Sequence, residues 1–266
     1  MTITSRSNAT IKAIRKLRLR GERERAGCFF VEGVRQVAEA VQLGAPLDEL
    51  IVAPELLRSP FARELVADAT ERGVPVLEVS PEVFRSLSLK EHPQGLAAVV
   101  RQRWAALDEI APRAGLCWLA LEAVADPGNL GTILRTAEAV GAGGVILLGP
   151  STDPYDPTAV RASTGAVFSQ PLVRATLAAF AAWAGRHGLQ VAGASPAAAL
   201  DYAGAPYQRP LVLLLGSERQ GLSPDGLAIC DLLVRIPMAG RSDSLNLAVA
   251  TGIVLYEIFN QARLAT

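Results

Sequence analysis

Residues 211–221 read LVLLLGSERQG, five apolar residues followed at once by a glycine and a charged segment. Successive side chains of a strand point to opposite faces of the sheet, so a strand that is apolar throughout must be buried on both faces. Parallel sheets covered by helices on each side bury their strands in this way, and they bind ligands beyond the carboxyl ends of the strands. This stretch therefore predicts a central strand of an α/β domain, followed by a loop at the ligand-binding edge.

An alternation of short apolar strands with helical stretches extends outward from this strand in both directions. Around it we predict strands at residues 116–121, 145–148, 167–173, 189–192 and 232–236, and a final helix at residues 244–261. An earlier series has strands at residues 28–31, 50–52, 74–79 and 96–100 and helices at residues 34–43, 61–72 and 81–89. Residues 101–113 are charged, contain Pro112 and interrupt this alternation. We predict an N-terminal domain at residues 1–104, a linker at residues 105–113 and a C-terminal domain at residues 114–266.

Composition and missing motifs exclude several classes of protein. Half of the 266 residues are apolar, which is enough for a sizeable core. The three cysteines are far apart in the sequence, which excludes a disulfide framework or a CxxC pair and points to the cytoplasm. The first residues contain no apolar core region and no apolar run reaches membrane-spanning length, so we expect neither a leader peptide nor a membrane helix. It also lacks the HExxH, GxSxG and P-loop motifs, so we expect no metal centre, no elbow-type serine hydrolase and no P-loop NTPase.

The net charge of zero conceals a basic N-terminal arm. Residues 1–25 hold eight lysines and arginines against two glutamates, so they carry +6 while the rest of the chain carries −6. Apolar residues at near-helical spacing predict one amphipathic helix over residues 8–25, with Asn8 as its N-cap. Its cations either form an ordinary solvated face or bind the phosphates of a nucleic acid, and Arg15, Arg18 and Arg20 are our candidates for phosphate contacts.

Three segments of the C-terminal half place glycines and polar residues beside apolar strands. Residues 125–137 read ADPGNLGTILRTA, residues 215–223 read LGSERQGLS, and residues 236–250 read IPMAGRSDSLNLAVA. In a purely structural interpretation, Asn129 and Ser244 are helix N-caps, and Arg135 lies along a helix surface. Each segment taken alone is weak evidence of function.

Taken in order, the three segments resemble the signature motifs of the SPOUT superfamily, specifically of the SpoU/TrmH-type RNA ribose 2'-O-methyltransferases. The first is similar to the family's N-x-G-x-x-x-R motif, the second to G-x-E-x-x-G-L and the third to I-P-M-x-G-x-x-x-S-L-N. Residues 160–168, VRASTGAVF, resemble the segment between the first two motifs, and Arg161 within it is a further candidate for RNA binding. In the N-terminal half, FVEGVR at residues 30–35 and HPQG at residues 92–95 resemble parts of an RNA-recognition domain found in some members.

The resemblance implies a C-terminal SPOUT domain with a mostly parallel sheet and a deep trefoil knot, preceded by a smaller α/β domain that recognises RNA. It implies S-adenosylmethionine as the cofactor, held in the knot by backbone around the second and third motifs. The positions of this chain that match are Leu215, Gly216, Ile236, Met238 and Leu245. It also implies a homodimer whose interface includes the last helix.

The catalytic positions implied by the resemblance are Arg135, Asn129, Glu218, Ser244 and Asn246. Arg135 matches the catalytic arginine, which acts either as the base for the ribose hydroxyl or as a ligand of an RNA oxygen; the second role suits a protonated guanidinium better. Ser217 stands where many relatives have asparagine, so a side-chain contact at that position is in doubt. We expect a methyltransferase that acts on ribosomal RNA. The alternatives are a transfer-RNA 2'-O-methyltransferase and a non-catalytic RNA-binding or assembly protein.

Overall fold

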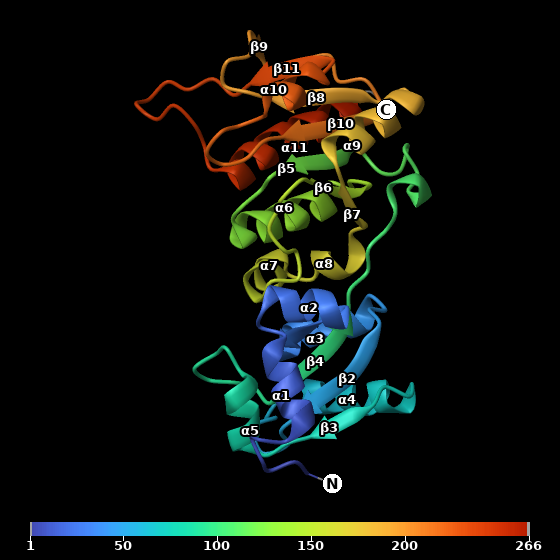
Figure 1. Cartoon of the computed structure of the whole chain (residues 1–266), viewed down its shortest axis with the longest axis vertical. Helices are drawn as coiled ribbons and strands as arrows, with labels where there is room; N and C mark the ends of the chain where they lie inside the picture. Colours follow the sequence, from blue (N-terminus) through green and yellow to red (C-terminus); the bar gives the residue numbers. More distant parts are fainter. Residues whose placement is uncertain (1, 265–266) are drawn as a thin grey trace. The chain divides into compact units, whose positions relative to one another are not determined.

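The computed structural model describes residues 2–264 and divides into two compact units (Figure 1). The first unit comprises the chain up to Gln102 together with Tyr155–Phe168. The second unit comprises Arg103–Pro154 and the chain from Ser169 onward. Residues 155–168, which we predicted within the C-terminal domain, are thus part of the first unit. The boundaries that we drew for independently folding domains stay predictions.

The second unit is built on a seven-stranded sheet in the order β7-β6-β5-β10-β8-β11-β9. Every strand pairing of this sheet within the described residues is parallel. Its strands are β5 (Trp118–Glu122), β6 (Gly144–Leu148), β7 (Leu172–Ala175), β8 (Gln190–Ala194), β9 (Leu200–Asp201), β10 (Leu211–Leu215) and β11 (Leu232–Arg235). The predicted central strand therefore lies at residues 211–215 and pairs with a strand on each side, which confirms the α/β class with a large parallel sheet.

Helices cover both faces of this sheet, as the burial of β10 requires. Val212 and Leu214 pack into a cluster with Trp183, while Leu213 and Leu215 point to the opposite face, and all of β10 is buried. Two helices of the unit, α6 and α11, pack against each other. The helices are η1 (Leu107–Glu109), α6 (Pro127–Ala139), α9 (Leu177–Arg186), α10 (Pro224–Ala228) and α11 (Leu247–Leu264). Within residues 2–264 no helix combines the length and apolarity needed to cross a membrane.

The first unit has a four-stranded sheet in the order β1-β4-β2-β3, in which only β2 and β3 are parallel. Its elements are α1 (Ala9–Lys16), α2 (Arg20–Ala26), β1 (Cys28–Glu32), α3 (Val34–Gln42), β2 (Leu47–Val52), α4 (Pro60–Glu71), β3 (Val76–Glu78), α5 (Pro81–Leu87), β4 (Leu96–Arg101), α7 (Pro157–Ser163) and most of α8 (Ala166–Ser169). Phe30 belongs to a buried cluster with residues of α1 and α5. The neighbouring Phe29 points to the other face, where its ring lies 4.6 Å from that of Tyr155 and 6.2 Å from that of Phe168.

The predicted basic helix is in fact two helices, α1 and α2, which is a correction to the sequence analysis. Asn8 caps α1 as expected, accepting hydrogen bonds from the amides of Thr10 and Ile11. The helix ends at Lys16, and the carbonyl oxygens of the next two residues accept hydrogen bonds from the Arg23 guanidinium, at 2.9 Å for Leu17 and 2.8 Å for Arg18. In a continuous helix those oxygens would accept bonds from backbone amides four residues on.

The predicted strand at residues 167–173 is wrong over its first half. Residues 166–169 form the short helix α8, and the strand β7 begins only at Leu172. A short apolar run without alternation fits a buried helix as well as a buried strand, and β7 retains only the end of the predicted segment. The two-residue strand β9 gave no periodic signal and was missed.

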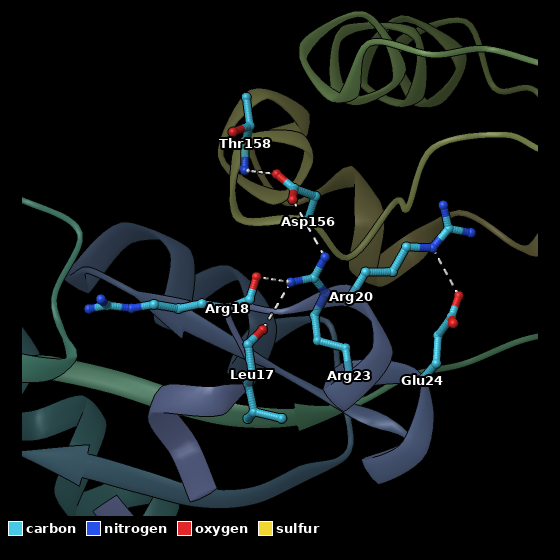
Figure 2. A network of polar contacts seen from close by, with 7 residues as sticks. All are labelled: Leu17, Arg18, Arg20, Arg23, Glu24, Asp156 and Thr158. Atoms are coloured by element: carbon cyan, nitrogen blue, oxygen red, sulfur yellow. Dashed lines mark hydrogen bonds and ion pairs between the residues drawn. The ribbon is translucent and has the colours of Figure 1, made fainter. Parts of the chain in front are cut away.

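Arg23 also joins the two segments of the first unit, and Figure 2 shows how it is placed. Its side chain is 2% exposed, and besides the two carbonyls it contacts a carboxylate oxygen of Asp156 at 3.4 Å. The other oxygen of Asp156 accepts from the amide of Thr158 at 2.8 Å and caps α7. One guanidinium thus bonds the turn between α1 and α2 and anchors residues 155–168.

We predict that Arg23→Met lowers the free energy of unfolding by about 2–4 kcal/mol, because it removes the donor of two carbonyl oxygens and of one carboxylate oxygen of Asp156. Arg25→Met is the control, since Arg25 is an exposed arginine of the same helix, paired with Glu22. Urea unfolding of the full chain measures both. Equal stability of the two variants would show that the buried guanidinium contributes nothing.

Candidate active site

The candidate site lies where the strand order of the second unit reverses. From β5 the chain continues to β6 and β7 on one side, and β10 pairs with β5 on the other side. Leu121 and Leu215 are in register near the carboxyl ends of these two strands. Ligands of open α/β sheets bind beyond such a reversal. The first two motif segments follow these two strands directly.

Glu218 ties the loop after β10 to the loop after β5. Its carboxylate accepts hydrogen bonds from the amide of Ala125 at 3.1 Å and the amide of Asp126 at 3.2 Å. It also accepts from the side-chain amide of Asn129 at 3.1 Å. Three donors on one carboxylate fix both loops in a single arrangement.

Asn246 extends this network to the third segment. Its side-chain nitrogen donates to the side-chain oxygen of Asn129 at 2.9 Å, and its own oxygen accepts from the amides of Ala248 at 2.9 Å and Val249 at 3.3 Å. Asn129, Glu218 and Asn246, which are up to 117 residues apart in the sequence, therefore form one connected chain of side chains.

The purely structural interpretations of Asn129 and Ser244 are wrong. The cap of α6 is Asp126, whose carboxylate accepts from the amide of Asn129 at 2.7 Å, and this leaves the Asn129 side chain for the network. The helix α11 begins at Leu247, with Asn246 as its capping acceptor, so Ser244 lies in the loop before it. Asp126 could have been recognised from Pro127, because aspartate before proline is a common start of a helix.

The hydrogen bonds determine the charge state of Glu218. Burial raises the pKa of its carboxyl, but the hydrogen bonds from Asn129 and from the backbone amides of Glu218, Ala125 and Asp126 together outweigh it. The net pKa is below the usual value for glutamate. Glu218 is therefore ionised at neutral pH and acts here as an acceptor that positions Asn129, not as a proton donor.

Glu122 makes a second link between the same loops, and the sequence analysis missed it. Its carboxylate, at the end of β5, accepts from the amide of Ser223 at 3.0 Å. Ser223 in turn caps α10. A charged residue that ends an otherwise apolar strand was the available signal.

Two glycines shape the loop after β10 for different reasons. A Cβ on Gly216 would lie 1.9 Å from the carbonyl carbon of Gly221, closer than any real contact. Gly221 has a φ of +67°, which glycine adopts without strain. Between them, Ser217 and Gly221 exchange backbone hydrogen bonds of 3.0 Å. The second motif is thus a compact turn in which position 216 has no room for a side chain.

The third segment keeps its backbone polar groups unused. In the described structure, no backbone amide or carbonyl of residues 236–245 bonds to another backbone group. Met238 is 38% exposed, and Ile236 and Leu245 are half-buried. These groups suit a polar, flat ligand held by backbone donors and acceptors. Of the predicted cofactor residues, Leu215 and Gly216 are buried.

Arg135 and Ser244 are not joined to the network. Both side chains are exposed, and neither forms a hydrogen bond or ion pair with any residue among 2–264. Arg135 lies on the exposed side of α6, so its guanidinium is available to a ligand. The structure thus brings together three of the five predicted catalytic residues.

The candidate RNA-binding arginines differ in their surroundings. Arg18 is half-buried and donates to the carbonyls of Ser86, Leu87 and Ser88 at the end of α5. Arg15 donates to the hydroxyl of Ser86 at 2.7 Å. Arg20 pairs with Glu24 at 3.0 Å. Arg161 is exposed and has no partner among the described residues. RNA binding by these four arginines stays a prediction, and Arg15 and Arg18 also stabilise the first unit.

Comparison with known proteins identifies the family of this chain. The sequence profile of the SpoU rRNA methylase family matches residues 117–256, more than half of the chain. The chain belongs to the SpoU rRNA methylase family. A profile of an MRM3-like substrate binding domain matches residues 8–98.

Individual members of the SpoU family match along nearly the whole chain. A 23S rRNA (uridine(2479)-2'-O)-methyltransferase of Streptomyces viridochromogenes is 36% identical over 91% of this chain and 86% of its own length. A 23S rRNA (guanosine(2553)-2'-O)-methyltransferase of Bacillus subtilis is 29% identical over 96% and 98%. The AdoMet-bound rRNA methyltransferase of Sinorhizobium meliloti has a TM-score of 0.90 and 38% identity, and the match covers 98% of both chains. These matches confirm the predicted family, the predicted enzyme class and S-adenosylmethionine as the cofactor.

Gly216→Ala is predicted to reduce the affinity for S-adenosylmethionine at least tenfold, because the new methyl group must displace the backbone of Gly221. Gly185→Ala is the matched control, since Gly185 lies in α9 and a Cβ there would meet nothing within 4 Å. Isothermal titration calorimetry compares the two. Cofactor binding of Gly216→Ala at the level of Gly185→Ala would refute the steric argument.

The ionised Glu218 should contribute stability that depends on pH. Its folded pKa lies below the unfolded one, so the contribution is complete above the unfolded value of about 4.3 and is lost as pH falls through the folded pKa. Glu218→Gln should unfold more easily than wild type by only about 0.5–1 kcal/mol at pH 7, because solvent screens this exposed carboxylate. The gap should shrink below about pH 4. Exposed Glu138→Gln on α6 is the control, and a gap that stays constant from pH 7 to pH 3 would contradict the assignment.

Proposed function

We propose that this protein transfers the methyl group of S-adenosylmethionine to a ribose 2'-hydroxyl of 23S ribosomal RNA. The observation that carries the proposal is the chain Glu218–Asn129–Asn246, which connects all three motif loops at the reversal point of a parallel sheet. Unrelated surface turns would not be joined by side-chain hydrogen bonds between residues nearly 120 positions apart in the sequence.

The cofactor would be held by backbone of residues 215–216 after β10 and of residues 236–245 before α11. When bound, S-adenosylmethionine supplies a methyl group on a positively charged sulfur. The backbone groups of residues 236–245 that have no backbone partner in the described structure are the donors and acceptors such a ligand needs. Gly216 permits the close approach because its position admits no side chain.

The network positions groups, and Arg135 contacts the RNA. A guanidinium offers five donors in a planar fork, so we assign the exposed Arg135 to binding the ribose oxygen or the adjacent phosphate of the target nucleotide. Arg135 would hold the ribose oxygen while that oxygen takes the methyl group, its proton passing to solvent and the cofactor departing as a neutral thioether. The exposed hydroxyl of Ser244 and the amide of Asn246 flank the loop in which the two substrates would meet.

Relatives named for 23S rRNA support the ribosomal substrate over transfer RNA, because they match through both units of the chain. Their names specify a uridine and a guanosine and the same 2'-O position, so the chemistry these relatives have in common concerns the ribose and not the base. The site of action would be the cytoplasm, where ribosomes are assembled. The non-catalytic alternative is disfavoured because every motif residue of the network is present and connected.

Two finer features of the family complete the proposal. The first is the trefoil knot, which would be formed by the chain around the loops of residues 216–222 and 236–246. The second is a homodimer through α11, on which Val249 and Tyr256 are 51% and 47% exposed. Exposed apolar side chains on an 18-residue helix are suited to an interface.

Sedimentation equilibrium tests the dimer. Tyr256→Asp on α11 should weaken the association of two chains, whereas Phe61→Asp on α4 should not.

Arg135→Ala should lower methyl transfer to protein-free 23S rRNA at least a hundredfold while changing cofactor affinity less than twofold. Arg135→Lys keeps the charge but loses the paired planar donors, and it should recover only part of the rate. Arg113→Ala, an exposed arginine before β5, is the control. Tritium transfer from labelled cofactor to 23S rRNA and to bulk transfer RNA measures rate and substrate together. Activity within a few-fold of wild type, or transfer RNA as the better substrate, would overturn the proposal.

A further inference from the structure

The first unit contains a cavity of about 260 Å³ that the catalytic network does not use. Its walls come from the junction of β1 and α3, from the segment before β4, and from α7. The sequence stretches FVEGVR, HPQG and VRASTGAVF, which the motifs of the second unit left unexplained, all contribute to it. A cavity much larger than the ~30 Å³ of one water molecule can take a ligand of several heavy atoms.

Three cations line this cavity: Arg35, Lys90 and Arg161. Arg35 and Arg161 are exposed, and the side chain of neither forms a hydrogen bond or ion pair within the described residues. The ammonium group of Lys90 lies 3.4 Å from the backbone carbonyl of Glu32. The local charge is therefore positive, with two guanidinium groups available to a ligand.

The one carboxylate in the cavity wall does not neutralise these cations directly. Glu32 accepts a hydrogen bond from the hydroxyl of Ser88 and another from the amide of Leu89 at 2.9 Å. Its side chain thus holds the loop that carries Lys90 against the end of β1. The carboxylate contributes to the shape of the cavity and positions one of its cations.

The start of α3 adds to the preference for an anion. Gly33 is the N-cap, with a φ of +106° and no side-chain cap. A Cβ there would lie 2.5 Å from the Lys90 nitrogen, so the absence of a side chain keeps the ammonium group in the cavity. Gln94 caps only the amide of Val34, at 3.3 Å. The next amides belong to a first helical turn, where the helix dipole favours negative charge.

Apolar and amide groups distinguish this cavity from a simple phosphate site. Phe30, Val31 and Val160 line it, and so does the half-exposed Leu89. The side-chain oxygen of Gln36, another lining residue, is buried without a partner in residues 2–264. An apolar wall beside free guanidinium groups matches an unpaired nucleotide, which presents a flat base, a sugar and a phosphate.

We propose that this cavity binds one unpaired nucleotide of the RNA substrate, with its phosphate between Arg35, Lys90 and Arg161. The proposal deepens the proposed function and rests on it for the identity of the RNA. Base-specific selection then belongs to the first unit, whereas the second unit acts on the ribose. This division agrees with relatives that match along both units but are named for a uridine and a guanosine.

The test compares two doubly substituted full-length chains with the same loss of charge. Arg35→Gln with Arg161→Gln removes the two free cations of the cavity. Arg58→Gln with Arg85→Gln removes two exposed arginines of the same unit that do not line it. The probes are a labelled single-stranded RNA of mixed sequence and protein-free 23S rRNA as methyl acceptor.

The cavity variant should bind the RNA at least tenfold more weakly than wild type, with a slope of log affinity against log salt flatter by about 0.7 per lost phosphate contact. Its KM for 23S rRNA should rise while cofactor affinity stays within twofold of wild type. Arg35→Lys with Arg161→Lys should retain the salt slope. The control variant should bind RNA within twofold of wild type.

Two outcomes would overturn the proposal. If RNA binding weakens equally in the cavity and control variants, the RNA binds a general basic surface. If RNA binding weakens in neither variant, the RNA does not use the cavity. If the wild-type chain methylates no RNA and RNA binding is lost only in the cavity variant, the proposed function is refuted and the proposal for the cavity is supported. A wild-type chain that binds no RNA would overturn both.

Discussion

The carboxylate of Glu218 accepts hydrogen bonds from two backbone amides and one side-chain amide, all from the segment that follows β5. A carboxylate with three donors holds the two loops far more firmly than either would be held alone, and its depressed pKa keeps it an acceptor. Asn129 can reach Asn246 only because Glu218 orients its amide and Asp126 has taken over the capping of α6. The geometry of the site therefore depends on this one side chain.

The parallel sheet makes such an interaction available. All strands point the same way, so the loops after β5, β10 and β11 leave from one edge although they are far apart in the sequence. The strands of this sheet are apolar and helices cover both of its faces. Polar side chains that can act on a ligand are therefore confined to the loops at the strand ends. In the first unit the comparable position is the junction of β1 and α3, where the cations of the cavity gather.

Patterns in the sequence predicted what is local and strongly apolar. Both ends of the strand at residues 211–215 were predicted correctly, because a strand buried on both faces is apolar throughout and a glycine and polar residues follow it directly. Residues 166–169 could not, since a four-residue apolar helix has the composition of a strand. The break after α1 was also missed, because the Arg23 side chain bonds to the carbonyls of Leu17 and Arg18 and local helix propensity gives no sign of such a contact.

Resemblance identified Asn129, Glu218 and Asn246, but their bonds to one another depend on Asp126 replacing Asn129 as the cap. The cavity of the first unit escaped prediction because its cations come from three segments separated by more than fifty residues.

The anchoring of Tyr155–Phe168 has a consequence for how this architecture can be recombined. The chain passes from one compact unit to the other at residues 102–103, 154–155 and 168–169, so the first unit is built from two separate stretches of sequence. A chimera that joins the first hundred residues of one enzyme to the remainder of another would bring together an α2–β1 surface and a 155–168 segment that did not evolve as a pair. Phe29, Tyr155 and Phe168, together with Arg23 and Asp156, form the joint that such a graft must carry over intact. If the first unit recognises the RNA as proposed, its recognition surface is encoded by two separate stretches of sequence, and a transplant must move both.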